Sequence, residues 1–315
     1  MEYTCLTPVL LIFFNRPDTF AKVFEKVRKA KPKTLILAQD GPRDDKDLAG
    51  INACRRIAEN VDWACDIIYD YSQENLGCGV RPQSAITNAL NKFEQIIILE
   101  DDCVPSDSFF QYCDEMLEKY KDDERISYIS GLNHFETWDC GENSYFFAKT
   151  GAIWGWATWK RAWAFYDYGV ELVNDAYLQK TIKGQVNDRY VADAKLNAWK
   201  QVNKLTKEQV KLSYWDVQWG LVKYSQNQVV IVPKYNQICN IGIGETSTHA
   251  QKTKKAQFKK NVSYFFIPTH TLQFPLVHPR YCYPDVYYDK KVNKNLNHHK
   301  IFRKLKKLFP IKTHK

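Results

Sequence analysis

Three adjacent acids, Glu100, Asp101 and Asp102, are the residues best suited to chemistry, and they directly follow the apolar run at 96–99. The run predicts a buried strand, so the three carboxylates repel one another and lose hydration. A divalent cation removes this penalty. Carboxylate oxygens suit Mn²⁺ or Mg²⁺, which complete their shell with phosphate oxygens and water. A solvated acidic turn is the alternative, and we favour the metal because the preceding strand is apolar.

The elements that position this triplet alternate between strand and helix. Strands are expected at 8–14, 34–38, 66–69 and 95–99, and helices at 19–29, 44–60 and 81–93. This alternation predicts an α/β fold with a mainly parallel central sheet and helices on both faces. Ligands of such sheets bind beyond the C-terminal strand ends. The polar segments expected to converge there are 15–16, 39–41, 74–77 and 100–102.

The pattern becomes mixed after residue 105. Helices are expected at 108–120, 188–202 and 215–226, and strands at 126–129 and 228–233. The Trp-rich segment 154–163 reads as a helix from about Ala157, with most rings in the core and Trp154 or Trp156 available to stack on a sugar. No internal repeat or low-complexity linker is present. We therefore expect one domain over 1–285, with a donor half at about 1–105 and an acceptor half at about 106–285.

The charge of the chain is concentrated at its end. The formal net charge is +9, yet residues 290–315 contain nine Lys, one Arg and no acid. The body is thus nearly neutral, which argues against a nucleic-acid-binding protein. The tail at 286–315 contains an amphipathic segment whose apolar residues are 301, 302, 305, 308 and 309. This pattern favours binding to an anionic membrane surface, although a disordered tail or a nucleic-acid contact gives the same composition.

The remaining bulk features point to a cytoplasmic protein at the inner face of the membrane. The nine cysteines have irregular spacing and no Cys-x-x-Cys pair, which gives a zinc site no support and suggests free thiols in a reducing compartment. No apolar run reaches the roughly 18 residues of a membrane-spanning helix. The first residues lack the pattern of a signal peptide.

The motifs resemble those of GT-A glycosyltransferases. Glu100-Asp-Asp102 followed by Cys103-Val-Pro-Ser-Asp-Ser-Phe-Phe-Gln-Tyr112 is similar to the metal motif of the metazoan α-mannoside N-acetylglucosaminyltransferases. The segments 154–163 and 240–249 resemble bacterial glycosyltransferases of polysaccharide clusters. The similarity extends in order over about residues 5–250. It implies a metal-dependent transfer of a hexosyl or N-acetylhexosaminyl group from a nucleotide-sugar donor to a saccharide acceptor, in the synthesis of a bacterial surface polysaccharide or glycan.

The resemblance also implies roles for the triplet. Asp102 would bind the Mn²⁺ or Mg²⁺ that bridges the donor's two phosphates. Asp101 would face the ribose or the donor sugar, and Glu100 would support one of them. Asp40 lies where this fold contacts the base, and a carboxylate there accepts from the imide N–H of uracil, which favours a UDP-sugar. Turn chemistry at Asp40-Gly-Pro explains the residue equally well.

Other candidate residues follow from position. Asn15 and Arg16 follow the first strand and either contact the nucleotide or open a helix. Arg81 follows a glycine-bearing loop and either binds the diphosphate or ribose, or lies at the surface of a first helical turn. The resemblance implies that His249 is a further metal ligand, and a solvated loop residue is the alternative. It also implies that Asp216, at a predicted helix start, is the general base of an inverting reaction, and a helix-capping acid is the alternative.

Two other functions remain compatible with these features. A sugar nucleotidyltransferase has a related fold, but it usually begins with a Gly-rich, basic loop after the first strand, and Asn15-Arg-Pro17 contains no glycine. A non-catalytic, membrane-associated nucleotide-sugar binding protein would not need Asp216. The acceptor is a saccharide, with a lipid-linked one as an option, because the basic tail would bring the enzyme to a membrane.

Overall fold

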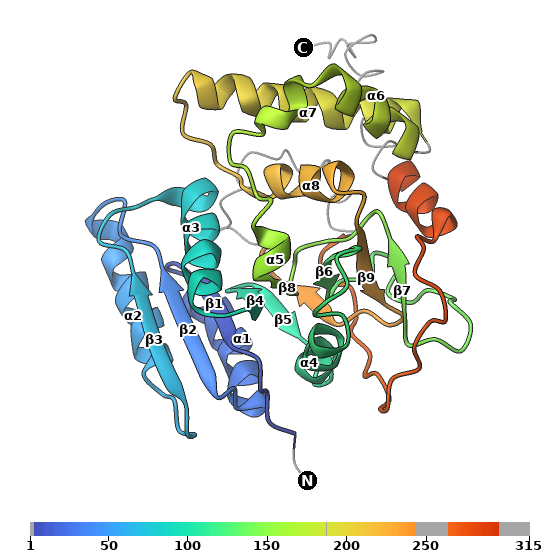
Figure 1. Ribbon diagram of the computed structural model, residues 1–315. Coiled ribbons are helices and arrows are strands. Elements are labelled where there is room, and N and C mark those ends of the chain that lie inside the picture. The colour runs from blue at the N-terminus through green and yellow to red at the C-terminus, as the bar shows by residue number, and fades with distance from the viewer. Residues whose placement is uncertain (1–2, 187, 244–263, 296–315) are drawn as a thin grey trace, which may run out of the picture.

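Figure 1 shows a computed structural model of the chain, which describes residues 3–186, 188–243 and 264–295. Eight strands form one sheet in the order β3-β2-β1-β4-β8-β6-β9-β7, and β10 pairs with β5 in a small second sheet. The strands are β1 Val9–Phe13, β2 Thr34–Gln39, β3 Asp66–Tyr71, β4 Gln95–Glu100, β5 Cys103–Pro105, β6 Ile126–Ser130, β7 Tyr145–Ala148, β8 Trp156–Trp159, β9 Val229–Pro233 and β10 Ile238–Asn240.

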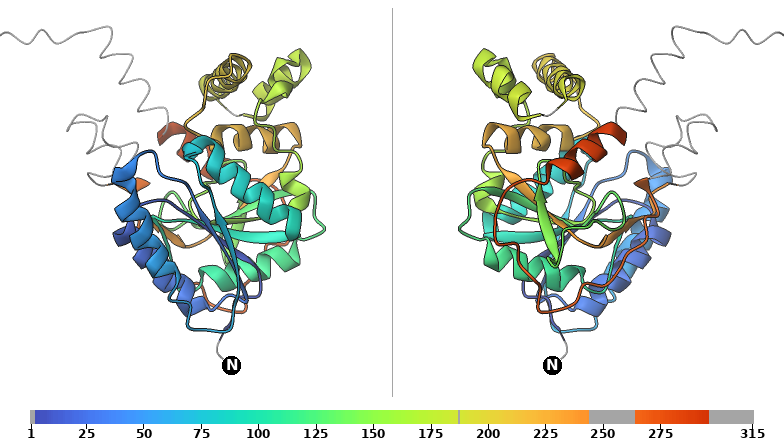
Figure 2. Two further views of the ribbon diagram at one scale, coloured as in Figure 1. Left: turned by 90° about the vertical axis from the view of Figure 1, so that its left-hand side faces the viewer. Right: turned by 90° about the vertical axis from the view of Figure 1, so that its right-hand side faces the viewer.

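Helices cover both faces of the large sheet. One hydrophobic cluster joins the sheet to α1, α2 and α4, and a second joins it to α3, α5 and α8. The edge-on views in Figure 2 show these two layers on either side of the strands. The helices are α1 Pro17–Ala30, α2 Leu48–Ala58, α3 Gly77–Lys92, α4 Phe109–Lys119, α5 Lys160–Trp163, α6 Ala176–Gln185, α7 Arg189–Lys207 and α8 Asp216–Ser225, with short 3₁₀ turns at Asp45–Asp47 and Glu171–Asn174.

The donor half folds as the apolar runs predict. All five residues of β1 are buried, with Leu11 packed toward α1 and α2 and Leu10 toward α3. A strand covered on both faces needs such an uninterrupted apolar run. β1 pairs in parallel with both β2 and β4, and β2 pairs in parallel with β3. The carboxyl ends of these four strands therefore share one edge, and the expected α/β architecture is confirmed.

The Trp-rich segment differs from its predicted helix. Trp156 to Trp159 form β8, which pairs antiparallel with β4 and β6, and the helix begins only at Lys160. Alternating Trp, Ala, Thr and Trp fit a pleated surface, with Trp156 and Trp159 packed on opposite faces. The spacing of Trp156, Trp159 and Trp163 also fits a helix, so periodicity alone does not distinguish a strand from a helix here.

The acceptor half adds a further layer. Helices α6 and α7 lie outside α8 and share a separate hydrophobic cluster with it (Figure 1). A helix over 286–295, drawn in red, then buries Tyr288 and Val292 against the sheet side of the molecule. The sequence predicts a basic tail from residue 286, but these ten positions pack into the domain. The amphipathic segment at 301–309 lies outside the described residues.

Two further observations concern the cysteines and the helices. All nine cysteines are unpaired. Among the described residues, no helix combines the length and apolarity required to cross a bilayer.

Candidate active site

The acidic triplet lies at the shared edge of the parallel strands. Glu100 is the last residue of β4 and stands beside Ile12 of β1 in the sheet register. Asp101 is 3 % exposed and accepts a hydrogen bond from the backbone N–H of Phe14 at 3.3 Å. Asp102 then leads into β5. The carboxylates are therefore held by the two central strands, as the apolar run before them predicts.

Arg16 is the cation that the structure places on these acids. Its guanidinium donates to the Asp101 carboxylate and, at 2.9 Å, to Asp102 Oδ2. Arg16 is also the residue before α1, whose first position is Pro17, so the helix start fixes its backbone. Of the two roles left open for Arg16, the structure has the helix opening, and contact with the nucleotide stays a prediction.

The electrostatics of the cluster show how crowded the carboxylates are. Burial raises the pKa of Glu100 well above its usual value, and the charges of Asp102, Asp101 and Asp216 raise it further. Burial also raises the pKa of Asp101, although the Arg16 guanidinium opposes this shift. Asp216 comes from the acceptor half, at the start of α8.

The surroundings of Asp102 fit a small hard cation in part. Its carboxylate accepts from Cys103 Sγ at 3.4 Å, and its backbone carbonyl accepts from Ile241 N at 2.9 Å. Gly242 packs so closely that an added Cβ would lie 2.7 Å from the carboxyl carbon of Asp102. Over the described ranges, no three His, Cys, Asp or Glu side chains form a closed metal site. The donor set suits a cation held by one or two carboxylates and completed by phosphate oxygens.

Asp40 contacts the connection between β3 and α3. Its carboxylate accepts from Leu76 N and Gly77 N at 2.8 Å each, and from Gly41 N at 3.0 Å. Of the two roles that the sequence allows for Asp40, a turn and a contact with the base, these hydrogen bonds correspond to the turn. They hold the first turn of α3 to the end of β2. A contact between Asp40 and uracil stays a prediction.

Arg81 lies deeper than its sequence position suggests. Helix α3 begins at Gly77, so Arg81 belongs to the second turn, is 3 % exposed and forms an ion pair with Asp70 at 3.1 Å. It also donates to the carbonyl of Gln39 at 3.3 Å. The alternative of a surface arginine in a first helical turn is wrong, because the helix begins at Gly77, before the predicted start at residue 81. Its guanidinium joins β2, β3 and α3, and contact with a phosphate stays a prediction.

The remaining residues predicted for the site are Asn15, His249 and the two tryptophans proposed to stack on a sugar. Asn15 Nδ2 donates to Asp47 Oδ1 at 2.7 Å, and this bond attaches the β1 end to the start of α2. The metal-ligand prediction at His249 lies outside the described residues. Trp156 is 1 % exposed in the core, so it offers no surface to a sugar, whereas Trp154 is partly exposed and packs on Phe265 with ring centroids 4.8 Å apart.

The sequence analysis did not identify Cys78 of α3, or the segment before α8, as neighbours of the candidate site. Cys78 is exposed in the first turn of α3. Partial burial is the largest cause that raises the pKa of its thiol, and the charges of Glu100, Asp40 and Asp216 raise it further. The thiol donates to the carbonyl of Ser213, in the segment before α8. The only sequence signal was the pair of glycines that flanks Cys78.

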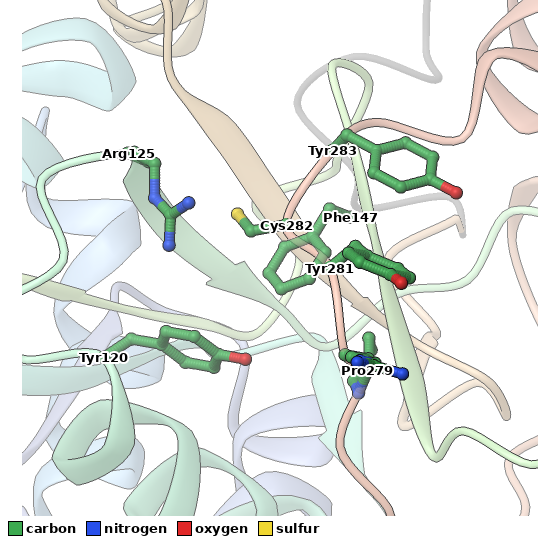
Figure 3. Close-up of a pocket in the computed structure, with 8 residues that line it drawn as sticks. Tyr120, Arg125, Phe147, Pro279, Tyr281, Cys282 and Tyr283 are labelled. Atoms are coloured by element: carbon green, nitrogen blue, oxygen red, sulfur yellow. The ribbon is translucent and has the colours of Figure 1, made fainter.

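One hollow of the surface lies away from these acids. Figure 3 shows a pocket of about 430 Å³ lined by Tyr120, Arg125, Phe147, Pro279, Arg280, Tyr281, Cys282 and Tyr283. Arg125 directly precedes β6, which runs in the same direction as β4 because both are antiparallel to β8. The pocket is thus at the opposite end of the strands from Glu100, and it belongs to no predicted site.

Comparisons with known proteins give only distant likeness. No family model and no curated protein matches the chain. A solved UDP-glucose pyrophosphorylase complexed with UDP-glucose is 13% identical, covers 80% of this chain and 99% of its own, and has a TM-score of 0.36. HddC from Yersinia pseudotuberculosis is 11% identical over 50% of this chain and 78% of its own, with a TM-score of 0.30.

A third structure, 4-diphosphocytidyl-2C-methyl-D-erythritol synthase from Anaerococcus prevotii, is 13% identical over 76% of this chain and 92% of its own, with a TM-score of 0.33. Likeness at this level carries no argument about the activity of the chain. The glycosyltransferase family therefore stays a prediction, and the functional argument rests on the site.

Proposed function

We propose that this protein is a metal-dependent glycosyltransferase that uses a nucleotide-sugar donor. The observation that carries the proposal is the set of adjacent carboxylates Glu100, Asp101 and Asp102 at the C-terminal end of β4, where Asp101 is buried and Arg16 donates to both Asp101 and Asp102. Asp216 begins α8, and its charge contributes to the raised pKa of Glu100. A donor diphosphate needs cationic charge, and an acceptor hydroxyl needs a base on the other side of the sugar. The acids at the end of β4 would hold a cation for the diphosphate, and Asp216 would be the base.

The residues divide the work as follows. Asp102 would hold Mn²⁺ or Mg²⁺, which when bound stabilises the negative charge on the leaving diphosphate, and Asp101 would face the ribose or the donor sugar. Asp216 accepts the proton of the acceptor hydroxyl as its oxygen bonds to the anomeric carbon. The bond from that carbon to the phosphate oxygen breaks, and the nucleoside diphosphate leaves. Attack from the face opposite the leaving group inverts the anomeric centre.

The donor nucleotide is proposed to carry uridine, and the acceptor to be a saccharide that belongs to a surface polysaccharide or glycan. The basic tail would bring the enzyme to an anionic membrane surface, where a lipid-linked acceptor is found. Sedimentation with vesicles of anionic or neutral lipid, with the full chain and with a chain ending at residue 295, tests this part. Equal sedimentation of both chains would exclude a role of the tail.

A sugar nucleotidyltransferase is the alternative, because metal-binding acids at a strand end serve that reaction as well. The short connection from Phe13 to Pro17 has no glycine with which to wrap a triphosphate. The products separate the two enzymes. We expect release of UDP from a UDP-sugar with an acceptor pool, and no pyrophosphate from a sugar 1-phosphate with a nucleoside triphosphate. Release of pyrophosphate from a sugar 1-phosphate and a nucleoside triphosphate, together with no sugar transfer from a UDP-sugar, would favour the nucleotidyltransferase.

A further inference from the structure

The connection between α7 and α8 is packed directly on the first turn of α3. A Cβ built on Gly79 would overlap the carbonyl oxygen of Leu212 and lie 2.7 Å from its carbonyl carbon and 3.1 Å from Tyr214 N. All three are backbone atoms, so no side-chain rotation relieves the overlap. Figure 1 shows this connection passing beside the start of α3 before it turns into α8.

Two hydrogen bonds also join the α7–α8 connection to the start of α3, and we call this contact the junction. Lys211 Nζ donates to the backbone carbonyl of Asn75 at 3.0 Å, and Cys78 Sγ donates to the carbonyl of Ser213 at 3.0 Å. Leu212 between them is 3 % exposed and belongs to the cluster of α7 and α8. The segment is thus anchored on both sides, to the donor half by polar contacts and to the acceptor half by its apolar side chain.

The junction is also tied to the central sheet. Asp40, at the end of β2, accepts from the first two backbone N–H groups of this region, Leu76 and Gly77, and Asn75 Nδ2 donates to Gly41 O at 2.7 Å. A chain of contacts therefore runs from β2 through the start of α3 to residues 211–213. Asp216 follows three residues later, in the first turn of α8.

We propose that Gly79 is a positioning residue for Asp216: its missing side chain lets the α7–α8 connection close onto α3 and so sets the place of the base relative to Glu100. This inference rests on the proposed function. It assigns to Asp40 and Asn75 a second task, that of holding the surface on which the acceptor half is seated. Displacement of a catalytic group by about 1 Å lowers transfer by roughly 10²-fold.

The test compares Gly79→Ala with Gly220→Ala. Gly220 lies in α8 itself, and an added Cβ there meets nothing within 4 Å, so it is a matched control. We expect Gly79→Ala to lower kcat by roughly 10- to 100-fold while the Kd for UDP with Mn²⁺ stays within about twofold. Gly220→Ala should leave both unchanged. Unchanged kcat in Gly79→Ala, or an equal loss of nucleotide binding, would overturn the proposal.

A readout that needs no catalysis accompanies this comparison. If the methyl group added by Gly79→Ala moves the connection, the bond from Cys78 to Ser213 is lost, and the thiol should react several-fold faster with maleimide, as followed by peptide mass spectrometry. Should Gly79→Ala fail to fold, Lys211→Met, which removes one junction contact, should show the same direction in kcat and in Cys78 labelling. A wild-type chain without transfer activity refutes the proposed function, whereas an active wild type with an unaffected Gly79→Ala refutes only the positioning role.

Discussion

Arg16 shares its guanidinium between Asp101 and Asp102, the two carboxylates that the proposed function assigns to the donor and its metal. A cation at that point would have to compete with this side chain or share the acids with it. Replacing Arg16 therefore tests how the charge of the acids affects stability while both carboxylates stay in place.

Replacing Arg16 by Ala should destabilise the metal-free protein, because it leaves buried carboxylates without their counter-ion. The expected loss is about 2 kcal/mol. Mn²⁺ should then raise the Tm of the variant more than that of the wild type, as measured by thermal unfolding in EDTA and in Mn²⁺. Arg28→Ala, which breaks an exposed pair with Asp62, is the control. An equal Mn²⁺ effect on variant and wild type would contradict this account of Arg16.

Replacing Asp216 by Asn should spare donor binding and remove transfer. The amide keeps the size of the carboxylate but accepts no proton, so the rate of transfer should fall by roughly 10²- to 10⁴-fold. Nucleotide Kd and the rate of UDP release are the two measurements. Transfer at the wild-type rate would show that Asp216 is not the base.

The sequence predicted the place of these acids better than the contacts of their neighbours. The triplet could be found because a strand end is visible in the apolar pattern, and Asp216 because a predicted helix start coincides with the place that the family resemblance implies for a base. Arg81 and Asp40 could not be assigned, because their partners are a distant carboxylate, Asp70, and the backbone of the next loop. Such pairings depend on how elements pack, which one chain's periodicity does not contain.

Among the elements, α8 has an unusual composition for a buried helix. Lys223 is 7 % exposed, with its Nζ 5.7 Å from the ring centre of Tyr128. Burial, and then the charge of Lys195, lowers the pKa of Lys223 to about 7, while Asp289 acts in the opposite direction. The folded protein thus binds fewer protons here than the unfolded chain between this pKa and the usual one.

Lys223→Met should therefore stabilise the protein most at or below pH 7. Wild-type stability lost to this buried charge returns as the pH rises from about 7 toward the pKa of an unfolded-state lysine, by at most about 1.4 kcal/mol per pH unit. Urea unfolding between pH 6.5 and 9.5 should show the advantage of the variant shrinking with pH. Lys200→Met, on the exposed side of α7, is the control. A constant difference across this range would be contrary to the prediction.

Element prediction was accurate where apolar runs are long and failed where strands are short. The four donor-half strands and helices α1, α2, α4, α7 and α8 were found within a few residues. Strands β5, β7 and β10, with three or four residues each, lack enough positions to show a period. The sequence predicted a helix at β8 because its tryptophans fit both periods.

At the scale of the whole molecule, the two halves meet at one edge of a single sheet. The donor half supplies Glu100 at the end of β4, with Asp101 and Asp102 directly after it, and the acceptor half supplies Asp216 at the start of α8. Strand order beyond β4 could not be predicted, since β8, β6, β9 and β7 join the sheet out of sequence. The division into a donor and an acceptor half stays a prediction.

Calorimetric binding of nucleoside diphosphates with and without Mn²⁺, to the wild type and to Asp102→Asn, tests the central claim most directly. Loss of one carboxylate charge should remove the metal contribution while the fold remains. The account predicts UDP binding that requires Mn²⁺ in the wild type and falls at least about tenfold in Asp102→Asn. Absence of nucleotide binding under every metal condition, or equal binding by both proteins, would contradict it.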